Sequence, residues 1–381
     1  MNKINIIAGT NNFGLGPVGK LSSIVNSTRN DFNWYACGNK FDLNIFDKNI
    51  FKDILFSKDI DEINRFVRDN NITHAVVVLD VELSKILLSL GIKVVFVDSL
   101  PFMWTQADVD EGLLPLDATA YCAQKCINLT ENSKKVLSQI NNLCWVNPIQ
   151  SEPTKDFSLC DDDYVLINVG GLHSPIGNGE SYILTVILSL VEIFVDKNMK
   201  IIITCGSDAN KAIRKVLKEK GIKNSDEMVY TLKQGEFLSA VQNSYLFITS
   251  PGLTTIYETS SLNVPTILIP PQNLSQFYNI EFAKKILNRY KTMYWDVEKL
   301  CFNYLNKIID KGETYVVEKI YEYITELVDS EFNNIFKDKF NKLLNEDYML
   351  KENSDFVIDG NGVDDIKEIL FKLSEGEKSD E

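Results

Sequence analysis

Residues 249–258 read TSPGLTTIYE, and residues 263–272 read NVPTILIPPQ. A short apolar run over Leu246–Thr249 leads into this segment and is typical of a buried strand. Ser-Pro-Gly then indicates a tight turn, Thr254–Ser261 has helical spacing, and Thr266–Ile269 is a second apolar run. A strand, a helix and a strand in this order predict a βαβ unit of a parallel sheet.

The predicted helix of this segment contains one acidic residue, Glu258, among apolar neighbours. A buried carboxylate requires a polar partner. The two hydroxyls of a ribose are a suitable partner, because both can donate to one carboxylate. The alternative is that Glu258 points to solvent or caps a neighbouring turn.

A glycine-rich loop, VGGLHSPIGNG at Val169–Gly179, lies between a predicted strand and a long apolar helix. Free amides at a helix N-terminus favour negative charge and therefore suit a diphosphate. We expect Gly170, Gly171 and Ser174 to contact this diphosphate. His173 is expected either to contact a phosphate or the sugar, or to be a structural loop residue.

The first glycine-rich loop spans Ala8–Leu21, where Gly14, Gly16 and Gly19 form a G-x-G-x-x-G pattern. A dinucleotide site is disfavoured, because the first glycine lies well beyond the strand end and residues 36–39 supply no acid for a ribose. Two alternatives remain. The glycines either allow a tight strand-to-helix turn, or they form a backbone wall that approaches the acceptor closely.

The same alternation of short apolar runs and longer amphipathic stretches extends over most of the chain. The predicted strands are Ile4–Ala8, Phe32–Ala36, His74–Leu79, Val94–Val97, Ala120–Cys122, Tyr164–Val169, Lys200–Thr204, Met228–Thr231, Leu246–Thr249 and Thr266–Ile269. A polar, proline-containing stretch at Asn147–Asp163 divides the two series and predicts a linker. We therefore expect two doubly wound domains, residues 1–150 and 160–290, then helices over 291–350 and an acidic tail over 351–381.

The segment 249–279 resembles the donor-binding region of the GT-B glycosyltransferases, including the family that adds N-acetylglucosamine to the lipid-linked peptidoglycan precursor. The resemblance implies two Rossmann-like domains facing across a cleft, with a helical C-terminal extension. It implies that Glu258 holds the ribose. The remaining residues that it implies are Gly252, Leu253 and Thr254 at the diphosphate, and Gln272, Gln276 and Asn279 beside the sugar.

The N-terminal half resembles the cytosylglucuronic acid synthase-like proteins, through FGLGPVGK at residues 13–20 and VDSLPFMW at residues 97–104. This resemblance covers most of residues 1–290. It implies glycosyl transfer from a UDP-sugar, with UDP-glucuronic acid and cytosine as the type pair. It also places Gly14, Gly16 and Gly19 on the acceptor side.

Two acidic residues, Asp80 and Asp98, each follow an apolar strand of the predicted N-terminal sheet. Such a carboxylate could take a proton from the acceptor. We favour Asp98 as the catalytic base, since the neighbouring Phe102 and Trp104 could stack on a planar acceptor. Asp98 could instead be a structural turn residue, and Asp80 could cap the helix that begins near Glu82.

The chain has 381 residues and a formal net charge of −14, which disfavours binding to nucleic acid and to anionic membranes. There is no run of about 18 apolar residues that would predict a membrane span. The seven cysteines lack zinc-site spacing and are expected to be reduced thiols of a cytoplasmic protein. We expect neither a bound metal nor another cofactor.

The sequence therefore predicts a hexosyltransferase that moves a sugar from a UDP-sugar to a small-molecule acceptor such as a nucleobase. Three alternatives stay open. A UDP-sugar 2-epimerase would share the donor site without needing an acceptor, and a non-catalytic nucleotide-sugar-binding protein would bind the donor without turnover. A membrane-bound lipid glycosyltransferase would need a basic, apolar patch. The oligomeric state is not predicted.

Overall fold

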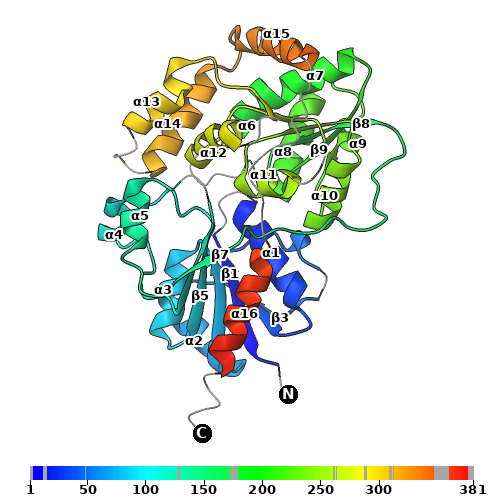
Figure 1. Ribbon diagram of the computed structural model, residues 1–381. Helices are drawn as coiled ribbons and strands as arrows, with labels where there is room; N and C mark the ends of the chain where they lie inside the picture. The colour runs from blue at the N-terminus through cyan, green and yellow to red at the C-terminus, as the bar shows by residue number, and fades with distance from the viewer. Residues whose placement is uncertain are drawn as a thin grey trace. The chain divides into compact units, whose positions relative to one another are not determined.

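The computed structural model describes residues 3–11, 15–47, 49–126, 129–170, 172, 179–260, 262, 264–286, 290–308, 311, 313–346 and 360–375. The chain divides into two compact units, each built on a parallel sheet with helices packed against it (Figure 1). Unit 1 holds Met1–Asn12, Gly16–Ser151 and Ile358–Glu381, and unit 2 holds Phe13–Leu15 and Glu152–Val357.

Unit 1 contains a parallel sheet with strand order β3-β2-β1-β4-β5-β6-β7. Its strands are β1 (Asn5–Thr10), β2 (Asn33–Cys37), β3 (Phe51–Leu55), β4 (His74–Val78), β5 (Lys93–Asp98), β6 (Ala120–Gln124) and β7 (Leu143–Val146). Its helices are α1 (Gly16–Thr28), α2 (Ile60–Asp69), α3 (Val81–Ser89), α4 (Gln106–Asp110), α5 (Glu131–Leu137) and α16 (Gly362–Glu375), with a 3₁₀ turn at Leu43–Ile45. The central strand β4 is buried along its whole length, as expected for a parallel strand covered on both faces.

Unit 2 repeats this architecture with strand order β10-β9-β8-β11-β12-β13. Its strands are β8 (Tyr164–Asn168), β9 (Lys200–Thr204), β10 (Val229–Tyr230), β11 (Leu246–Thr249), β12 (Thr266–Leu268) and β13 (Tyr290–Thr292). Its helices are α6 (Gly179–Tyr182), α7 (Leu188–Asp196), α8 (Ser207–Glu219), α9 (Ser225–Met228), α10 (Gln234–Gln242), α11 (Leu253–Ser260), α12 (Leu274–Ile286), α13 (Phe302–Lys307), α14 (Glu313–Glu326) and α15 (Phe332–Asn345). A π-helical turn at Ile183–Ile187 joins α6 to α7, and a 3₁₀ turn covers Glu298–Leu300.

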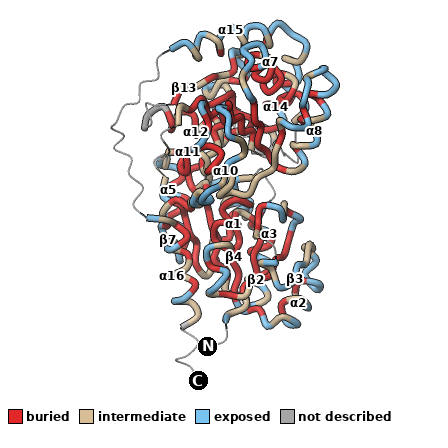
Figure 2. Tube along the Cα trace, turned by 90° about the vertical axis from the view of Figure 1, so that its right-hand side faces the viewer, coloured by how far each residue is buried: buried red, intermediate tan, exposed pale blue. Residues whose placement is uncertain are grey.

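The expected pair of doubly wound domains is confirmed, but three sheet-edge strands were missed. These are β3, β7 and β13, each of which lies at the edge of its sheet. Edge strands are covered less completely than central ones, so their sequences are short or half polar. Figure 2 shows the same contrast between buried central strands and exposed outer helix faces, and α15 is largely exposed along one side.

The C-terminal helix α16 folds back onto unit 1, beside α1 (Figure 1). The rings of Phe371 and Phe32 lie 5.1 Å apart, and Lys367 forms an ion pair with Asp31 at 2.8 Å. Residues 351–381 were expected to be an acidic tail, with one further helix as an option over 364–373. The described part of that segment is an amphipathic helix that covers α1.

The helices after β13 pack on unit 2, where the rings of Trp295 and Phe332 lie 5.5 Å apart and those of Phe194 and Phe340 lie 6.1 Å apart. All seven cysteines are free. Among the residues that the structure describes, no helix is both long and apolar enough to cross a membrane.

Candidate functional site

The carboxyl edge of the unit 2 sheet has a topological switch point between β8 and β11. These strands are neighbours, with Asn168 paired to Thr249, while β9 lies on the far side of β8 and β12 on the far side of β11. The connections after β8 and β11 therefore leave in opposite directions. In open parallel sheets, ligands bind at such a point.

The loop after β8 is tied to β11 by Asn168. Its side-chain Nδ2 donates to Thr249 Oγ1 at 3.1 Å, and its Oδ1 accepts from the Gly170 amide at 3.2 Å. Gly170 has a φ of +61°, a backbone conformation that residues other than glycine rarely adopt. Three other residues expected here, Gly171, His173 and Ser174, lie outside the described residues.

The loop after β11 leads into the N-terminus of α11 within a few residues. The Gly252 amide donates to Ser250 O at 2.7 Å, and the first helical bond runs from the Ile256 amide to Gly252 O at 2.9 Å. Within the described part of the chain, the amides of Leu253, Thr254 and Thr255 have no hydrogen-bond partner. These N–H groups and the helix dipole together favour an anion at this end of α11.

Glu258 lies on the second turn of the same helix and is only 4% exposed. Gln234, at the start of α10, donates from Nε2 to Glu258 Oε2 at 2.6 Å. The carboxylate therefore does not point to solvent, which excludes one alternative from the sequence analysis. A polar side chain from a neighbouring helix satisfies one of its oxygens instead.

The three polar residues expected beside the sugar hold the surrounding loops together. Gln272 Nε2 donates to Val169 O at 3.2 Å, and Gln276 Oε1 accepts from the Gln272 amide at 2.8 Å. Asn279 Nδ2 donates to Pro251 O at 2.9 Å, while its Oδ1 is buried with no partner. These bonds connect the β12 loop to the β8 loop and α12 to the turn before α11. Contact of these side chains with a sugar stays a prediction.

In unit 1, the predicted base Asp98 is fully buried at the end of β5. Its Oδ2 accepts from Trp104 Nε1 and from the Tyr121 hydroxyl, both at 2.8 Å, and its Oδ1 accepts from the Leu100 amide at 2.8 Å. Burial raises its pKa to about 6, although the three hydrogen bonds act in the opposite direction. This geometry gives Asp98 a structural function, and its role as base stays a prediction.

The other residues expected on the acceptor side are only partly accessible. Phe102 is buried, and Trp104 is half-buried with its indole N–H bound to Asp98. Gly16 is exposed where α1 begins, whereas Gly19 is buried inside that helix. Gly14 lies outside the described residues. Among the described members of the set, Gly16 and Trp104 are therefore the accessible ones.

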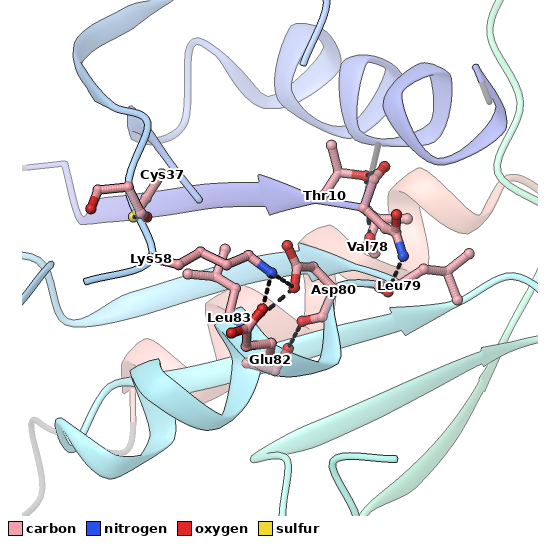
Figure 3. A network of polar contacts seen from close by, with 11 residues as sticks. Thr10, Cys37, Lys58, Val78, Leu79, Asp80, Glu82 and Leu83 are labelled. Carbon is pink, nitrogen blue, oxygen red and sulfur yellow. Dashed lines mark hydrogen bonds and ion pairs between the residues drawn. The ribbon is translucent and has the colours of Figure 1, made fainter. Parts of the chain in front are cut away.

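Asp80 follows β4 at the switch point of the unit 1 sheet, beside β1 (Figure 3). Its Oδ1 accepts from the Leu83 amide at 3.1 Å and from Lys58 Nζ at 3.0 Å, so Asp80 caps α3 as the alternative interpretation expected. Lys58 also contacts Glu82 at 2.6 Å. The second oxygen of Asp80 is buried and has no hydrogen-bond partner. Of the two candidate acids in unit 1, only Asp80 keeps an unused oxygen.

One site residue, Gln234, was missed by the sequence analysis. It lies four residues after the end of the short strand β10, at the same edge of the sheet. Its position after a strand is typical of a ligand-binding residue, but a glutamine there carries neither the glycine-rich pattern nor the acidic group that pointed to the other candidates. Among the described residues, no group of three or more His, Cys, Asp or Glu side chains is arranged to hold a metal ion.

Solved structures show what the complete fold is similar to. UDP-GlcNAc 2-epimerase from Methanocaldococcus jannaschii aligns with a TM-score of 0.54 at 16% identity, over 97% of this chain and 100% of that one. Phytolacca americana UGT2 aligns with a TM-score of 0.51 at 13% identity, over 97% of this chain and 100% of that one. A UDP-glucosyltransferase from Polygonum tinctorium aligns with a TM-score of 0.50 at 10% identity, over 91% of this chain and 99% of that one. At such identities the likeness shows the fold alone, which is GT-B.

Sequence comparison adds a match in unit 2. No curated protein matches this chain. The family model described as the glycosyltransferase family 28 C-terminal domain matches residues 178–326, a range that contains α11, Glu258 and Gln234. Within its GT-B fold, residues 178–326 of the chain are therefore similar to the C-terminal domain of glycosyltransferase family 28.

Proposed function

We propose that this protein is a glycosyltransferase that moves a sugar from a UDP-sugar to a small-molecule acceptor. One observation carries the proposal: three unpaired amides at the start of α11 lie on the same short helix as the buried carboxylate of Glu258. The amides suit a diphosphate and the carboxylate suits a ribose. The family 28 match over the same residues supports this assignment.

In this proposal, unit 2 stabilises the leaving group. As the bond between the sugar and the diphosphate breaks, negative charge grows on the diphosphate, and fixed N–H groups stabilise that charge without reorganising. Gly170, Gly252, Leu253 and Thr254 are proposed to surround the diphosphate, with Glu258 on the ribose. Gln272, Gln276 and Asn279 are proposed to line the sugar.

Unit 1 is proposed to bind the acceptor. The loop resemblance to cytosylglucuronic acid synthase-like proteins makes a hexose, specifically glucuronic acid, and a nucleobase the first pair to test. Asp98 stays the predicted base, although its carboxylate has no exposed surface and can meet an acceptor only if the Trp104 contact opens.

The test combines calorimetric titration with a panel of UDP-sugars and mass-spectrometric analysis of reactions that contain cytosine and related bases. Binding of one UDP-sugar and a new glycosylated product is the expected result. Interconversion of the donor without an acceptor would instead identify an epimerase. Binding without any turnover would identify a nucleotide-sugar-binding protein, and absence of binding would contradict the donor site itself.

A further inference from the structure

The side chain of Gln234 contacts Glu258 and comes from a different helix, α10. The Nε2–Oε2 distance of 2.6 Å is that of a strong, charge-assisted hydrogen bond. Gln234 is half-buried, and its amide oxygen has no partner within the described part of the chain. Its neutral amide orients the carboxylate and leaves the negative charge in place, whereas a lysine would neutralise that charge.

The backbone around Gln234 is held from outside its own helix. The Thr154 amide donates to Gly235 O at 3.0 Å, and Ser239 Oγ donates to Thr154 O at 2.8 Å. A Cβ atom at Gly235 would lie 2.6 Å from Thr154 Oγ1 and 3.0 Å from Glu152 O, so glycine fits best against the segment 152–154. The first turn of α10, and with it Gln234, therefore has a fixed position in unit 2.

A carboxylate on a flexible side chain binds a diol well only when its oxygens face the two hydroxyls. One oxygen of Glu258 accepts a hydrogen bond from Gln234, which restricts the rotation of the carboxylate. Gln234 thus acts on a vicinal diol through the orientation of Glu258.

We propose that Gln234 is a positioning residue that holds Glu258 for the ribose of the donor and makes the site selective for ribonucleotides. This inference rests on the proposed function, because it assumes that Glu258 binds ribose. It adds a role for α10, which neither the family match nor the sequence motifs assign to any residue.

The test uses UDP and 2′,3′-dideoxyuridine 5′-diphosphate as calorimetric probes of the full-length chain. We expect Gln234→Ala to weaken UDP binding roughly tenfold, since a hydrogen bond to a charged group is lost. Binding of the dideoxy probe should be unchanged. Gln234→Glu should weaken UDP binding further, because two carboxylates would face each other. Gln242→Ala is the matched control, as Gln242 is exposed at the opposite end of α10.

The double variant Gln234→Ala/Glu258→Gln should bind UDP no more weakly than Glu258→Gln alone, because Gln234 acts on the ribose only through the carboxylate of Glu258. If the wild-type protein prefers UDP and Gln234→Ala keeps that preference, this inference is wrong and the ribose assignment stands. If the wild-type protein binds both probes equally, Glu258 does not bind the ribose and the inference is overturned with it. If it binds neither, the proposed function fails as well.

Discussion

Asp98 in unit 1 and Glu258 in unit 2 are both buried carboxylates near the carboxyl edge of a parallel sheet, yet their surroundings differ. Asp98 accepts three hydrogen bonds from donors of its own unit, two of them from the side chains of Trp104 and Tyr121. Glu258 lies one turn from three unpaired amides and accepts from a glutamine of another helix. Burial alone therefore does not distinguish a structural carboxylate from a ligand-binding one.

The difference lies in what surrounds the carboxylate. Around Asp98, the donors belong to the fold and are used up, so removal of the carboxylate should mainly affect stability. On the helix of Glu258, the amides of Leu253, Thr254 and Thr255 remain unpaired within the described residues, so removal of this carboxylate should mainly affect binding. The four predictions that follow test this division, from the largest expected effect to the smallest.

Asp98→Ala should destabilise unit 1 by about 4 kcal/mol, because buried donors of Trp104, Tyr121 and Leu100 lose their acceptor. The loss should appear as a fall of roughly 10 °C in the unfolding temperature, measured by circular dichroism. Donor affinity, measured on the folded variant by calorimetry, should be unchanged. A variant of unchanged stability that has lost turnover would instead support Asp98 as the base.

The pH dependence of stability gives a second test of Asp98. Its folded pKa of about 6 lies above the ordinary value of 3.8, so the folded state retains a proton that the unfolded chain has released. The resulting stabilisation is complete below pH 3.8 and is lost as the pH rises through 6. Asp98→Asn should remove this part of the pH dependence in urea unfolding. An unaltered pH profile would mean that Asp98 does not titrate in this range.

Glu258→Ala should weaken UDP binding by about 100-fold, because two hydroxyls lose a charged acceptor. The unfolding temperature should change far less than it does in Asp98→Ala, since Gln234, which donates to Glu258, is half-buried and water can reach it. Calorimetry and thermal unfolding of the same preparation measure both quantities. Unchanged affinity would remove the ribose assignment.

Asp80→Asn should change the free energy of unfolding by less than about 1 kcal/mol, because asparagine also caps helices and Lys58 keeps its contact with Glu82. Asp80 has an oxygen without a partner, so it contributes less to the fold than Asp98 does. Urea unfolding of the variant beside Glu82→Gln provides the comparison. A loss as large as that of Asp98→Ala would show that hydrogen-bond counting does not separate the two acids.

The sequence was sufficient for the fold because central parallel strands are continuous apolar runs, as in β4 and β8. It was insufficient at the sheet edges, where β3 is largely exposed and carries no such run. The helix α16 was only an option in the sequence analysis, because its apolar stripe is short and its partner α1 lies far away in the sequence.

The candidate site was predicted in part. Glu258 was identified because a carboxylate in an apolar helix is unusual, and glycine-rich loops pointed to the sheet edge. Gln234 was not identified, because a glutamine at a helix start carries no local signal, and its contact with Glu258 spans 24 residues. The same limit applies to Asp98 and Asp80, since each follows a strand and only the tertiary hydrogen bonds distinguish them.

Hydrogen–deuterium exchange of the wild-type chain with and without UDP tests the central claim most directly. The amides of Leu253, Thr254 and Thr255 are unpaired and should exchange rapidly in the free protein. UDP should slow exchange in peptides that cover residues 250–258, whereas peptides from α16 in unit 1 should be unaffected. Protection confined to unit 1, or no protection at the start of α11 under saturating UDP, would contradict the assignment of the donor site to unit 2.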